Sequence, residues 1–380
     1  MTTLFEAVKT VKTQGSPLKA SMIDHLRQVD RTFVVWKNRR LSYFAGCDYF
    51  RLSSHPGVLR AVREGMERYG LNVAASRMTT GNHPLYTQLE KALARFFSAP
   101  SALLTGNGYS SNLIVVQVLG EDFSHIFMDE RAHLSMRDAS RFFAGPVREF
   151  KHRDAADLAR QLRRLRGKTR PLMLTDGLFA RDGELAPLAA YLKILPPRGM
   201  ILLDDAHAAG IIGATGKGTL EYAGVPRRRI IQTVTLSKAI GCYGGAILCE
   251  AALRQKIMTR SAMFAGSTPL PLPLAHAALE AMKILRGDPS LGRRLRRHVH
   301  RVKTTLRLRG LAVPATPAPI VCLVPRSAAE IARMRQRLLA RGVYPSFIHY
   351  PGGPKGGYFR FVISSEHSPR QLDDLLEGLK

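Results

Sequence analysis

The run MILLDDAH, residues 200–207, places two acidic residues and a histidine directly after four apolar residues. A short apolar run of this length, bounded by polar residues, is typical of a strand buried on both faces. Three further runs have the same character: ALLTG (102–106), PLMLTDG (171–177) and IIQTVTLS (230–237). These runs predict the strands of one central sheet.

Amphipathic helical patterns, at residues 154–165 and 188–195, separate these runs. Strands that alternate with helices favour an α/β fold, in which a mostly parallel sheet is flanked by helices. Open sheets of this kind bind ligands at the carboxyl ends of their strands. We therefore expect the functional residues directly after the apolar runs.

The pattern changes after Leu285. An arginine-rich helical stretch is followed by two strand-like runs and two further helices: PAPIVCLVP (317–325), a helix over 328–340, GYFRFVISS (357–365) and a helix from Ser368. This is the pattern of a small α+β unit. The predicted organisation is an N-terminal arm (1–45), a large domain (46–285) and a small C-terminal domain (286–380).

The 380 residues carry a formal net charge of +28. Most of the arginines lie in helical patterns at 160–170, 293–310 and 332–342, where aliphatic residues recur at helical spacing. Arginines in such a pattern are expected on the solvent-facing sides of amphipathic helices, which accounts for them without a binding partner. Attraction of an anionic partner, such as coenzyme A phosphates, an acidic carrier protein or RNA, stays open. No RNA-binding motif with interleaved aromatic residues is present, so no specific nucleic-acid partner is expected.

The four cysteines form no CxxC pair, so neither a disulfide framework nor a metal site is expected. No apolar run approaches 18 residues, and the start, MTTLFEAVKTVKTQG (1–15), lacks the apolar core of a signal peptide. The sequence therefore predicts a cytoplasmic protein without a membrane span.

Asp204 and His207 stand at the end of the third apolar run. Successive strand residues face opposite ways, so at most one of Asp204 and Asp205 faces a site. A carboxylate and an imidazole three residues apart could hold two atoms of one planar heterocycle. Capping residues in a loop would give the same pattern.

Two other segments carry polar groups near predicted strand ends. TGNGYSSN (105–112) combines glycines and serines at a helix start, which suits a phosphate, although an ordinary N-cap explains it equally. MDERAHLSMRD (128–138) places His133 in a loop, where it could stack on an aromatic ring or lie on the surface.

Lys238 lies in the apolar, glycine-flanked stretch TLSKAIGCYGG (235–245). A desolvated lysine has a lowered pKa and becomes a nucleophilic amine that forms Schiff bases. The order of glycine loop, histidine, Asp-x-x-His and lysine together indicates one cofactor, pyridoxal 5′-phosphate (PLP).

From about Leu41 to the end, the sequence resembles the α-oxoamine synthase family of fold type I PLP enzymes. The matching stretches follow the family's order: CDYFRLSSHPGV (47–58), SRMTTGNHPLYTQLE (76–90), TGNGYSSN, TDGLFARDGELAPL (175–188), LLDDAHAAGIIGATGKG (202–218), TLSKAIGCYGG and FRFVISSEHS (359–368). The resemblance implies a PLP-dependent acyltransferase with a large PLP-binding domain and a small C-terminal domain.

The resemblance also implies roles for individual residues. Lys238 would form the internal aldimine, Asp204 would pair with the pyridine nitrogen and His207 would contact the ring hydroxyl. The remaining matches are His133 stacked on the ring, Gly108, Tyr109 and Thr235 at the phosphate, Ser267 or Thr268 at a neighbouring subunit's phosphate, Arg360 at the amino-acid carboxylate and Arg27 at coenzyme A.

Several positions depart from the family pattern. Cys47 and Ala132 stand where asparagine is common, Ala180 replaces a serine, and Tyr358 replaces an arginine; Arg51 replaces a glycine, and Asn72, Val73 and Ala74 replace small flexible residues. These departures leave the cofactor residues intact and alter the substrate side of the site.

The implied reaction is a decarboxylating Claisen condensation of an amino acid with an acyl thioester, carried by coenzyme A or a carrier protein, in a homodimer. Within the family, the sequence Asp-Asp-Ala-His at 204–207 and a chain without long terminal extensions favour L-alanine and a pimeloyl thioester as substrates. Three alternatives stay open: another family member that uses glycine or serine, an aminotransferase or lyase of the same fold, and a basic binding protein without activity.

Overall fold

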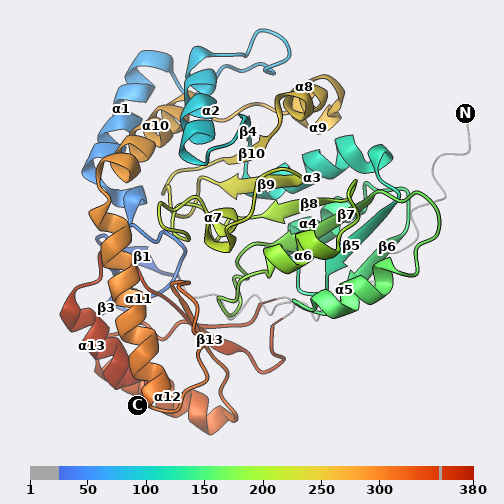
Figure 1. The fold of residues 1–380 in the computed structure, drawn as a ribbon. Coiled ribbons are helices and arrows are strands. Elements are labelled where there is room, and N and C mark those ends of the chain that lie inside the picture. The colour runs from blue at the N-terminus through green and yellow to red at the C-terminus, as the bar shows by residue number, and fades with distance from the viewer. Residues whose placement is uncertain (1–24, 351–352) are drawn as a thin grey trace, which may run out of the picture.

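The computed structural model describes residues 25–350 and 353–380. Its centre is a seven-stranded sheet with the order β4-β10-β9-β8-β7-β5-β6 (Figure 1). The strands are β4 (Ser101–Thr105), β5 (His125–Asp129), β6 (Val147–Phe150), β7 (Pro171–Asp176), β8 (Met200–Asp204), β9 (Ile230–Thr235) and β10 (Gly245–Cys249). Strands β9, β8, β7, β5 and β6 run parallel to one another, whereas β10 is antiparallel to both β4 and β9. The predicted α/β fold with a mostly parallel sheet is confirmed.

All four apolar runs form strands, but the first differs in its pairing. ALLTG lies in β4, which is the edge strand of the described sheet and pairs with the antiparallel β10. Strands β5, β6 and β10 were not predicted from the sequence. The arginine-rich stretch 160–170 is helical only to Leu162, and the residues after it, which include Gly167, form turns and a loop.

Helices cover both faces of this sheet, and the strand residues alternate between them. Leu172, Leu174 and Leu202 belong to one buried cluster, which also holds residues of α3 (Gly108–Leu119) and α4 (Leu134–Ser140). Met173, Ile201 and Leu203 pack instead against the opposite layer. That layer consists of α5 (Ala155–Leu162), α6 (Leu188–Ile194) and α7 (Thr219–Ala223).

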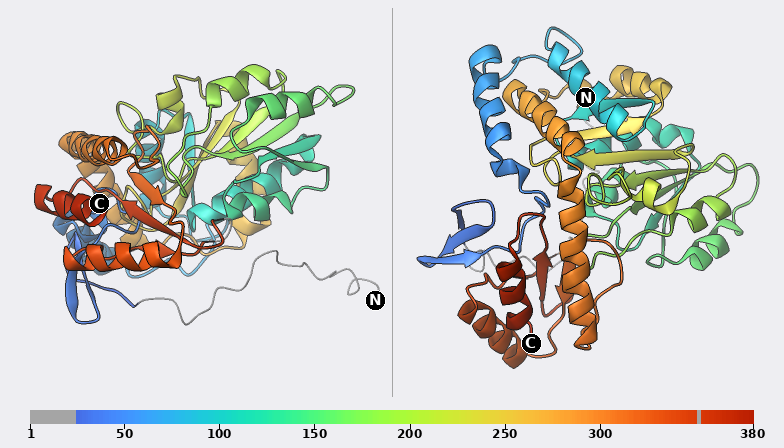
Figure 2. Two further views of the ribbon diagram at one scale, coloured as in Figure 1. Left: turned by 90° about the horizontal axis from the view of Figure 1, so that it is seen from below. Right: turned by 60° about the vertical axis from the view of Figure 1, so that its left-hand side comes forward.

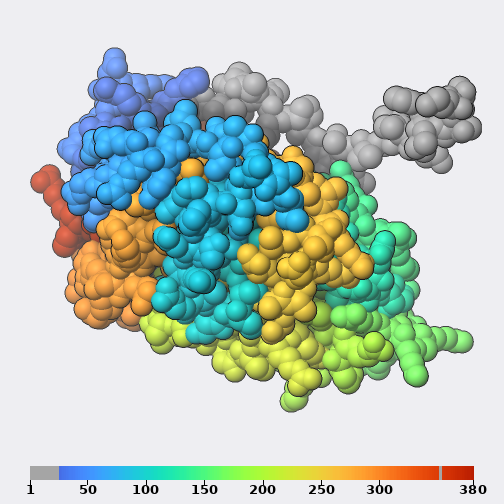
Figure 3. Space-filling model, turned by 90° about the horizontal axis from the view of Figure 1, so that it is seen from above, coloured from blue at the N-terminus to red at the C-terminus, as the bar shows by residue number. Residues whose placement is uncertain are grey.

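The remaining helices of the large domain lie around β4 and β10. They are α1 (Pro56–Tyr69), α2 (Pro84–Phe96), α8 (Ala251–Arg260), α9 (Ala262–Ala265) and α10 (Leu272–Gly287). Two short 3₁₀ turns, η2 (Leu52–Ser54) and η3 (Gly120–Asp122), complete this part. Figure 3 shows α1 and α2 in blue to cyan beside α8 and α9 in gold, on one continuous face.

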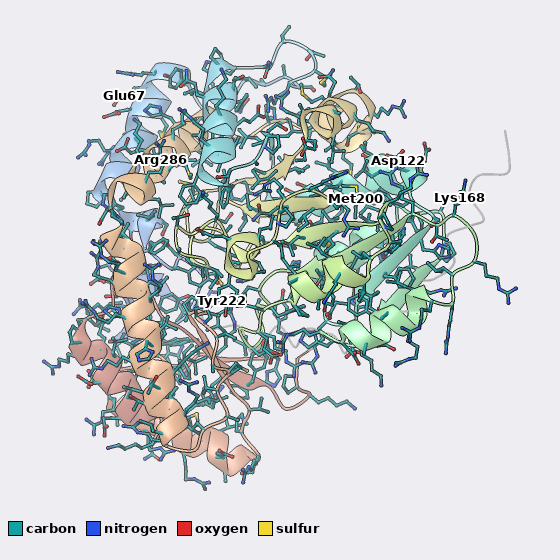
Figure 4. All side chains as sticks on the ribbon, viewed as in Figure 1. Glu67, Asp122, Lys168, Met200, Tyr222 and Arg286 are labelled. Carbon is teal, nitrogen blue, oxygen red and sulfur yellow. The ribbon has the colours of Figure 1, made fainter. Side chains whose placement is uncertain are left out.

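The carboxyl ends of the parallel strands face the C-terminal unit. Met200, the first residue of β8, and Lys168, ahead of β7, lie at the edge of the sheet away from that unit (Figure 4). The loops that follow β7, β8 and β9 are therefore on the side where the C-terminal unit lies.

The C-terminal unit is a three-stranded antiparallel sheet with three helices (Figure 2). Its elements are α11 (Ser290–Leu308), β11 (Ile320–Leu323), α12 (Ala328–Ala340), β12 (Phe347–Ile348), β13 (Tyr358–Val362) and α13 (Pro369–Gly378). Helix α13 begins with a capping box between Ser368 and Gln371, as the sequence pattern indicates. The predicted helix over 328–340 has the bounds that the structure gives.

The described part of the N-terminal arm packs on this unit. It forms a small antiparallel sheet of β1 (Arg27–Gln28), β2 (Phe33–Trp36) and β3 (Arg39–Ser42). Ser42 pairs with Val343 in an isolated bridge, and the Trp36 ring lies edge-on to Tyr344, with ring centroids 5.8 Å apart. The predicted domain bounds of 1–45, 46–285 and 286–380 stay a prediction.

Helix α11 shows what the excess of arginine does in the structure. Five of its six aliphatic residues are buried along one stripe, at Leu291, Leu295, Val299, Val302 and Leu306, whereas Leu308 at the helix end is exposed. The arginines between them are mostly exposed, as expected for an amphipathic surface helix. Within the described ranges, no helix is both long enough and apolar enough to span a membrane.

Candidate active site

Side chains alternate between the two faces of each strand, and this decides which of them can meet at the carboxyl ends of the parallel strands, called here the carboxyl edge. Leu202 faces α3 and α4, so Asp204, two residues later, faces the same way. Leu174 and Ile231 face the same helices, so residues two or four positions later in their strands lie on that face: Asp176, Thr233 and Thr235.

Asp204 is buried and held in a fixed orientation. Its Oδ2 accepts a hydrogen bond of 2.7 Å from the Asn112 amide nitrogen, and the Ser135 hydroxyl lies 3.5 Å from the same oxygen. The Thr233 hydroxyl in turn donates to the Asn112 amide oxygen at 2.7 Å. These hydrogen bonds fix the carboxylate, and no cation within 25–350 and 353–380 forms an ion pair with it, so it can pair with a cationic ring nitrogen.

Asp205 lies on the opposite face, as the alternation predicts. It accepts hydrogen bonds from the backbone N–H and the hydroxyl of Thr219, and from the Gln232 amide. Burial raises its pKa to about 6, although these donors act against the rise. Asp205 therefore holds the start of α7 and lies away from the candidate site.

His207 is fixed through one ring nitrogen. Its Nδ1 lies 2.9 Å from the Tyr49 hydroxyl, and both side chains are buried. Burial lowers the pKa of His207 well below its usual value, and Lys238 and Arg360 add to this. The imidazole is therefore neutral at physiological pH, with Nε2 left for a ligand.

His133 lies beside Asp204 at the start of α4. Its Nδ1 is 2.7 Å from the Ser135 hydroxyl, and its backbone N–H donates to Asp176 Oδ2 at 2.8 Å. Burial lowers the pKa of His133. Burial and the neighbouring Asp204 raise the pKa of Asp176 well above its usual value.

Lys238 follows β9 in a turn whose next two residues, Ala239 and Ile240, are buried. No residue in 25–350 or 353–380 forms a hydrogen bond or an ion pair with its amine. Burial lowers the pKa of Lys238, against the opposing fields of Cys47 and Asp204. A partly desolvated, unpaired amine of this kind is suited to a Schiff base.

The start of α3 lies against Thr235. Asn107 caps the helix, and its side chain accepts from the Ser110 N–H at 2.8 Å. A Cβ on Gly108 would stand 2.9 Å from the Thr235 Cβ, so only glycine allows this approach. A helix of 12 residues that begins beside a threonine hydroxyl is suited to a phosphate group.

Arg360 reaches the site from β13 of the C-terminal unit. Its Nε donates to the Ala180 carbonyl at 2.8 Å, and its Nη2 lies 3.6 Å from the Cys47 sulfur. The net pKa of Arg360 is raised: burial alone would lower it, but Cys47 and Tyr49 outweigh that effect.

The other predicted site residues lie farther out. Tyr109 is 41% exposed and bonds to Asp138, with its ring edge-on to His133 at 6.0 Å between centroids. Ser267 and Thr268 line a pocket of about 410 Å³ together with Asn107. Arg27 is exposed in β1, and no hydrogen bond among the described residues joins it to the site. The structure thus brings Tyr109 near His133 but does not bring Arg27 to Lys238.

Four residues that position the site were not singled out from the sequence: Tyr49, Asn112, Ser135 and Asp176. Tyr49 and Asn112 stand inside CDYF and TGNGYSSN, two stretches that carry the family resemblance. Their contacts join residues 158 and 92 positions apart. The sequence signal was therefore present, but nothing local assigns these side chains a partner.

A cluster of three possible metal ligands lies in the large domain, although the sequence predicts no metal site. Among the described residues, His152, Asp182 and Glu184 bring possible ligand atoms within 4.8 Å of one another. Both carboxylates are engaged by arginines: Asp182 lies 3.7 Å from Arg131, and Glu184 lies 2.7 Å from Arg153. The arrangement serves as an ion-pair network beside the loop that carries the Ala180 carbonyl.

The residues at the carboxyl edge fit PLP. Asp204 offers an oriented carboxylate, His207 an unused Nε2, Lys238 an unpaired amine and Thr235 a hydroxyl beside a helix start. PLP carries a pyridine nitrogen, a ring hydroxyl, an aldehyde and a phosphate, and these four protein groups match them in chemistry.

Comparisons with known proteins agree with this fit. Residues 47–379 match the family described as aminotransferase class I and II. The chain is 33% identical to a putative 8-amino-7-oxononanoate synthase of Desulforudis audaxviator over 97% of this chain and 96% of that protein. It is 34% identical to the 8-amino-7-oxononanoate synthase of Methylococcus capsulatus over 88% and 87%.

A solved serine palmitoyltransferase from S. paucimobilis, bound to a PLP–myriocin aldimine, has the same fold. Its TM-score is 0.87 at 24% identity, over 94% of this chain and 91% of that one. The chain belongs to the class I and II aminotransferase family and, within it, to the PLP-dependent α-oxoamine synthases.

Proposed function

We propose that this chain condenses L-alanine with a pimeloyl thioester and releases carbon dioxide and a thiol, as an 8-amino-7-oxononanoate synthase does. The observation that carries the proposal is the gathering of Lys238, Asp204, His207 and Arg360 at one edge of the sheet. The choice of substrates is supported by relatives of that name that are 33–34% identical over most of the chain.

Four side chains hold the cofactor in this proposal. Asp204 would accept a hydrogen bond from the protonated ring nitrogen, His207 would donate from Nε2 to the ring hydroxyl oxygen, and His133 would cover the ring. Thr235 and the N–H groups at the start of α3 bind the phosphate. When bound, PLP supplies a protonated ring that takes up the electron pair left at the amino-acid α-carbon.

Two side chains act on the amino acid. Arg360 binds its carboxylate with a planar fork of N–H groups, which also sets the orientation of the α-carbon. Lys238 removes the α-proton, because its lowered pKa makes the neutral amine available at physiological pH. The α-carbon then attacks the thioester carbonyl, the thiol leaves, and the β-keto acid loses carbon dioxide.

We further propose that the active sites are shared within a homodimer. The support is the family resemblance, in which the residues matched by Ser267 and Thr268 reach a neighbouring subunit's phosphate; within the single chain both line a pocket with Asn107. In the proposed dimer these hydroxyls serve the phosphate site of the partner subunit. Light scattering should give twice the 42.0 kDa mass of the chain, and a monomer with full activity would contradict the proposal.

The substrate assignment is tested with a matrix of substrates. L-Alanine, glycine and L-serine are each combined with short, medium and pimeloyl thioesters of coenzyme A and of a carrier protein, and free thiol is measured. We expect the highest kcat/KM for L-alanine with a pimeloyl thioester. The Lys238→Ala variant should release no thiol with any pair. Formation of an α-keto acid without thiol release would identify an aminotransferase instead.

A further inference from the structure

Cys47 lies at the carboxylate-binding arginine. Its side chain is half-buried, and its sulfur is 3.6 Å from Arg360 Nη2. The Nε of the same guanidinium is held by the Ala180 carbonyl. In residues 25–350 and 353–380, no carboxylate forms an ion pair with Arg360, so the thiol is the acidic group that contacts its fork.

The charges around this thiol are mainly positive or neutral. The ionisable groups that interact with it are Tyr43, Tyr49, Arg51, Lys238, Tyr350 and Arg360. The neighbouring Asp48 carboxylate instead accepts the N–H groups of Leu52 and Ser53. Burial alone would raise the pKa of the Cys47 thiol, but Arg360 and Lys238 outweigh burial and lower it.

The other three cysteines provide a comparison within the same chain. Burial raises the pKa of Cys242 to about 12, and those of Cys249 and Cys322 to about 11. Cys242 is half-buried, as Cys47 is. The two thiols differ in their charged neighbours, because Arg360 and Lys238 lower the pKa of Cys47, whereas Asp48 adds to the effect of burial on Cys242.

We propose that Cys47 is a nucleophilic thiolate that occupies the fork of Arg360 until the amino-acid carboxylate displaces it. Two consequences follow. Cys47 is the residue of this chain that soft electrophiles modify first, and it weakens the binding of the amino acid by competing for Arg360. The second consequence rests on the proposed function, whereas the first depends only on the described contacts.

The modification is a simple displacement. The thiolate sulfur attacks the methylene carbon of an alkylating agent such as iodoacetamide, a carbon–sulfur bond forms, and iodide leaves with the electron pair of the broken bond. The thiol proton has already passed to water. Because the thiolate is the reactive form, the rate follows the ionised fraction of each cysteine.

The first experiment measures alkylation of the PLP-loaded enzyme by iodoacetamide between pH 5.5 and 9.5, with mass spectrometry of each cysteine. We expect Cys47 to react at least about tenfold faster than Cys242 at pH 7, with a midpoint below the ordinary thiol value of about 8.5. In Arg360→Gln, Cys47 should slow by about tenfold at pH 7 while Cys242 keeps its rate. Equal rates for the two thiols, or no effect of Arg360→Gln, would overturn the proposal.

The second experiment tests displacement by the substrate. L-Alanine should protect Cys47, whereas L-alaninamide, which lacks the carboxylate, should not. The ratio of wild-type KM to Cys47→Ser KM for L-alanine should rise by about tenfold from pH 6 to pH 9, because the competing thiolate accumulates. Protection by both compounds, or a ratio independent of pH, would show that the thiol does not compete for Arg360.

The two experiments separate this proposal from the proposed function. If no amino acid and thioester pair releases thiol while Cys47 retains its fast, Arg360-dependent alkylation, the function is wrong and the thiolate stands. If thiol is released from L-alanine and a pimeloyl thioester but Cys47 reacts like Cys242, the thiolate is wrong and the function stands.

Discussion

The hydroxyl of Tyr49 contacts His207 and influences which nitrogen of its imidazole ring carries the proton. A hydrogen bond of 2.9 Å joins it to Nδ1, and the imidazole is neutral because burial keeps the pKa of His207 well below its usual value. When Tyr49 donates to Nδ1, the ring proton is on Nε2, which is the tautomer that can donate to a ring oxygen of the cofactor. Tyr49 thus acts as a positioning residue.

Removing this hydroxyl tests that role. Tyr49→Phe should lower kcat/KM by about tenfold, because a lost hydrogen bond of about 1.4 kcal/mol no longer selects the tautomer. Tyr191→Phe is the matched control, since the buried Tyr191 hydroxyl in α6 has no hydrogen-bond partner in the described part of the chain. Steady-state kinetics on both variants measure the effect, and equal activity of the two would refute the role of Tyr49.

The contacts of the site residues also show which parts of the candidate site could be predicted from the sequence and which could not. The candidates Asp204, His207, His133 and Lys238 could be proposed from order and residue type, and the structure brings them to one edge of the sheet. Their supports, such as Asn112 under Asp204, are joined to them only by the folded chain. A local pattern cannot name a partner 92 residues away.

Among the elements, the junction of α3 and β9 is the most constrained. Gly108 begins the helix, and an added Cβ would stand 2.9 Å from the Thr235 Cβ and 3.3 Å from its hydroxyl oxygen. That contact is closer than Cβ atoms tolerate, so the helix start would have to move away from Thr235. The proposed phosphate site lies at this junction.

Gly108→Ala should therefore weaken PLP binding by about tenfold or more, since misplaced N–H groups and the threonine hydroxyl no longer bind the phosphate together. Gly106→Ala is the control, because an added Cβ there meets nothing within 4 Å. Titration of the apoenzyme with PLP, followed by absorbance, gives both affinities. Equal affinities would show that the phosphate binds elsewhere.

The strands show a similar division between local and long-range information. The apolar runs of β7, β8 and β9 are buried on both faces, so composition alone identifies them. Strand β6 has exposed residues at the edge of the sheet, and β10 follows directly after the glycines near Lys238. The antiparallel insertion of β10 between β4 and β9 is a pairing across the chain, which no local run encodes.

At the scale of the molecule, Glu366 joins three separate segments. Its carboxylate lies 2.8 Å from Arg31 of the N-terminal arm and 2.9 Å from Arg294 of α11. Burial alone would raise the pKa of Glu366, but the two arginines outweigh burial and lower it. A lowered carboxyl pKa means that folding is stabilised by the ionised form.

Glu366→Gln should reduce the free energy of unfolding by about 1 kcal/mol at pH 7, discounted for the partial exposure of both arginines. The loss should be constant above the ordinary glutamate pKa of about 4.3 and should shrink as the pH falls below it, because the wild-type carboxylate is then protonated as well. Urea unfolding at several pH values measures it.

Glu67→Gln serves as the control, since Glu67 is exposed on α1 (Figure 4) and forms no ion pair within the described ranges. It should leave the unfolding free energy within about 0.5 kcal/mol of wild type. A Glu366→Gln loss that persisted unchanged at pH 4 would contradict the ion-pair explanation.

The measurement that tests the central claim most directly is the site of covalent attachment of PLP. The purified protein is incubated with PLP, reduced with borohydride, digested and analysed by mass spectrometry. We expect one phosphopyridoxyl group per chain, on Lys238, and none in Lys238→Ala treated in the same way. Stoichiometric labelling of a different lysine, or no labelling at all, would contradict the account.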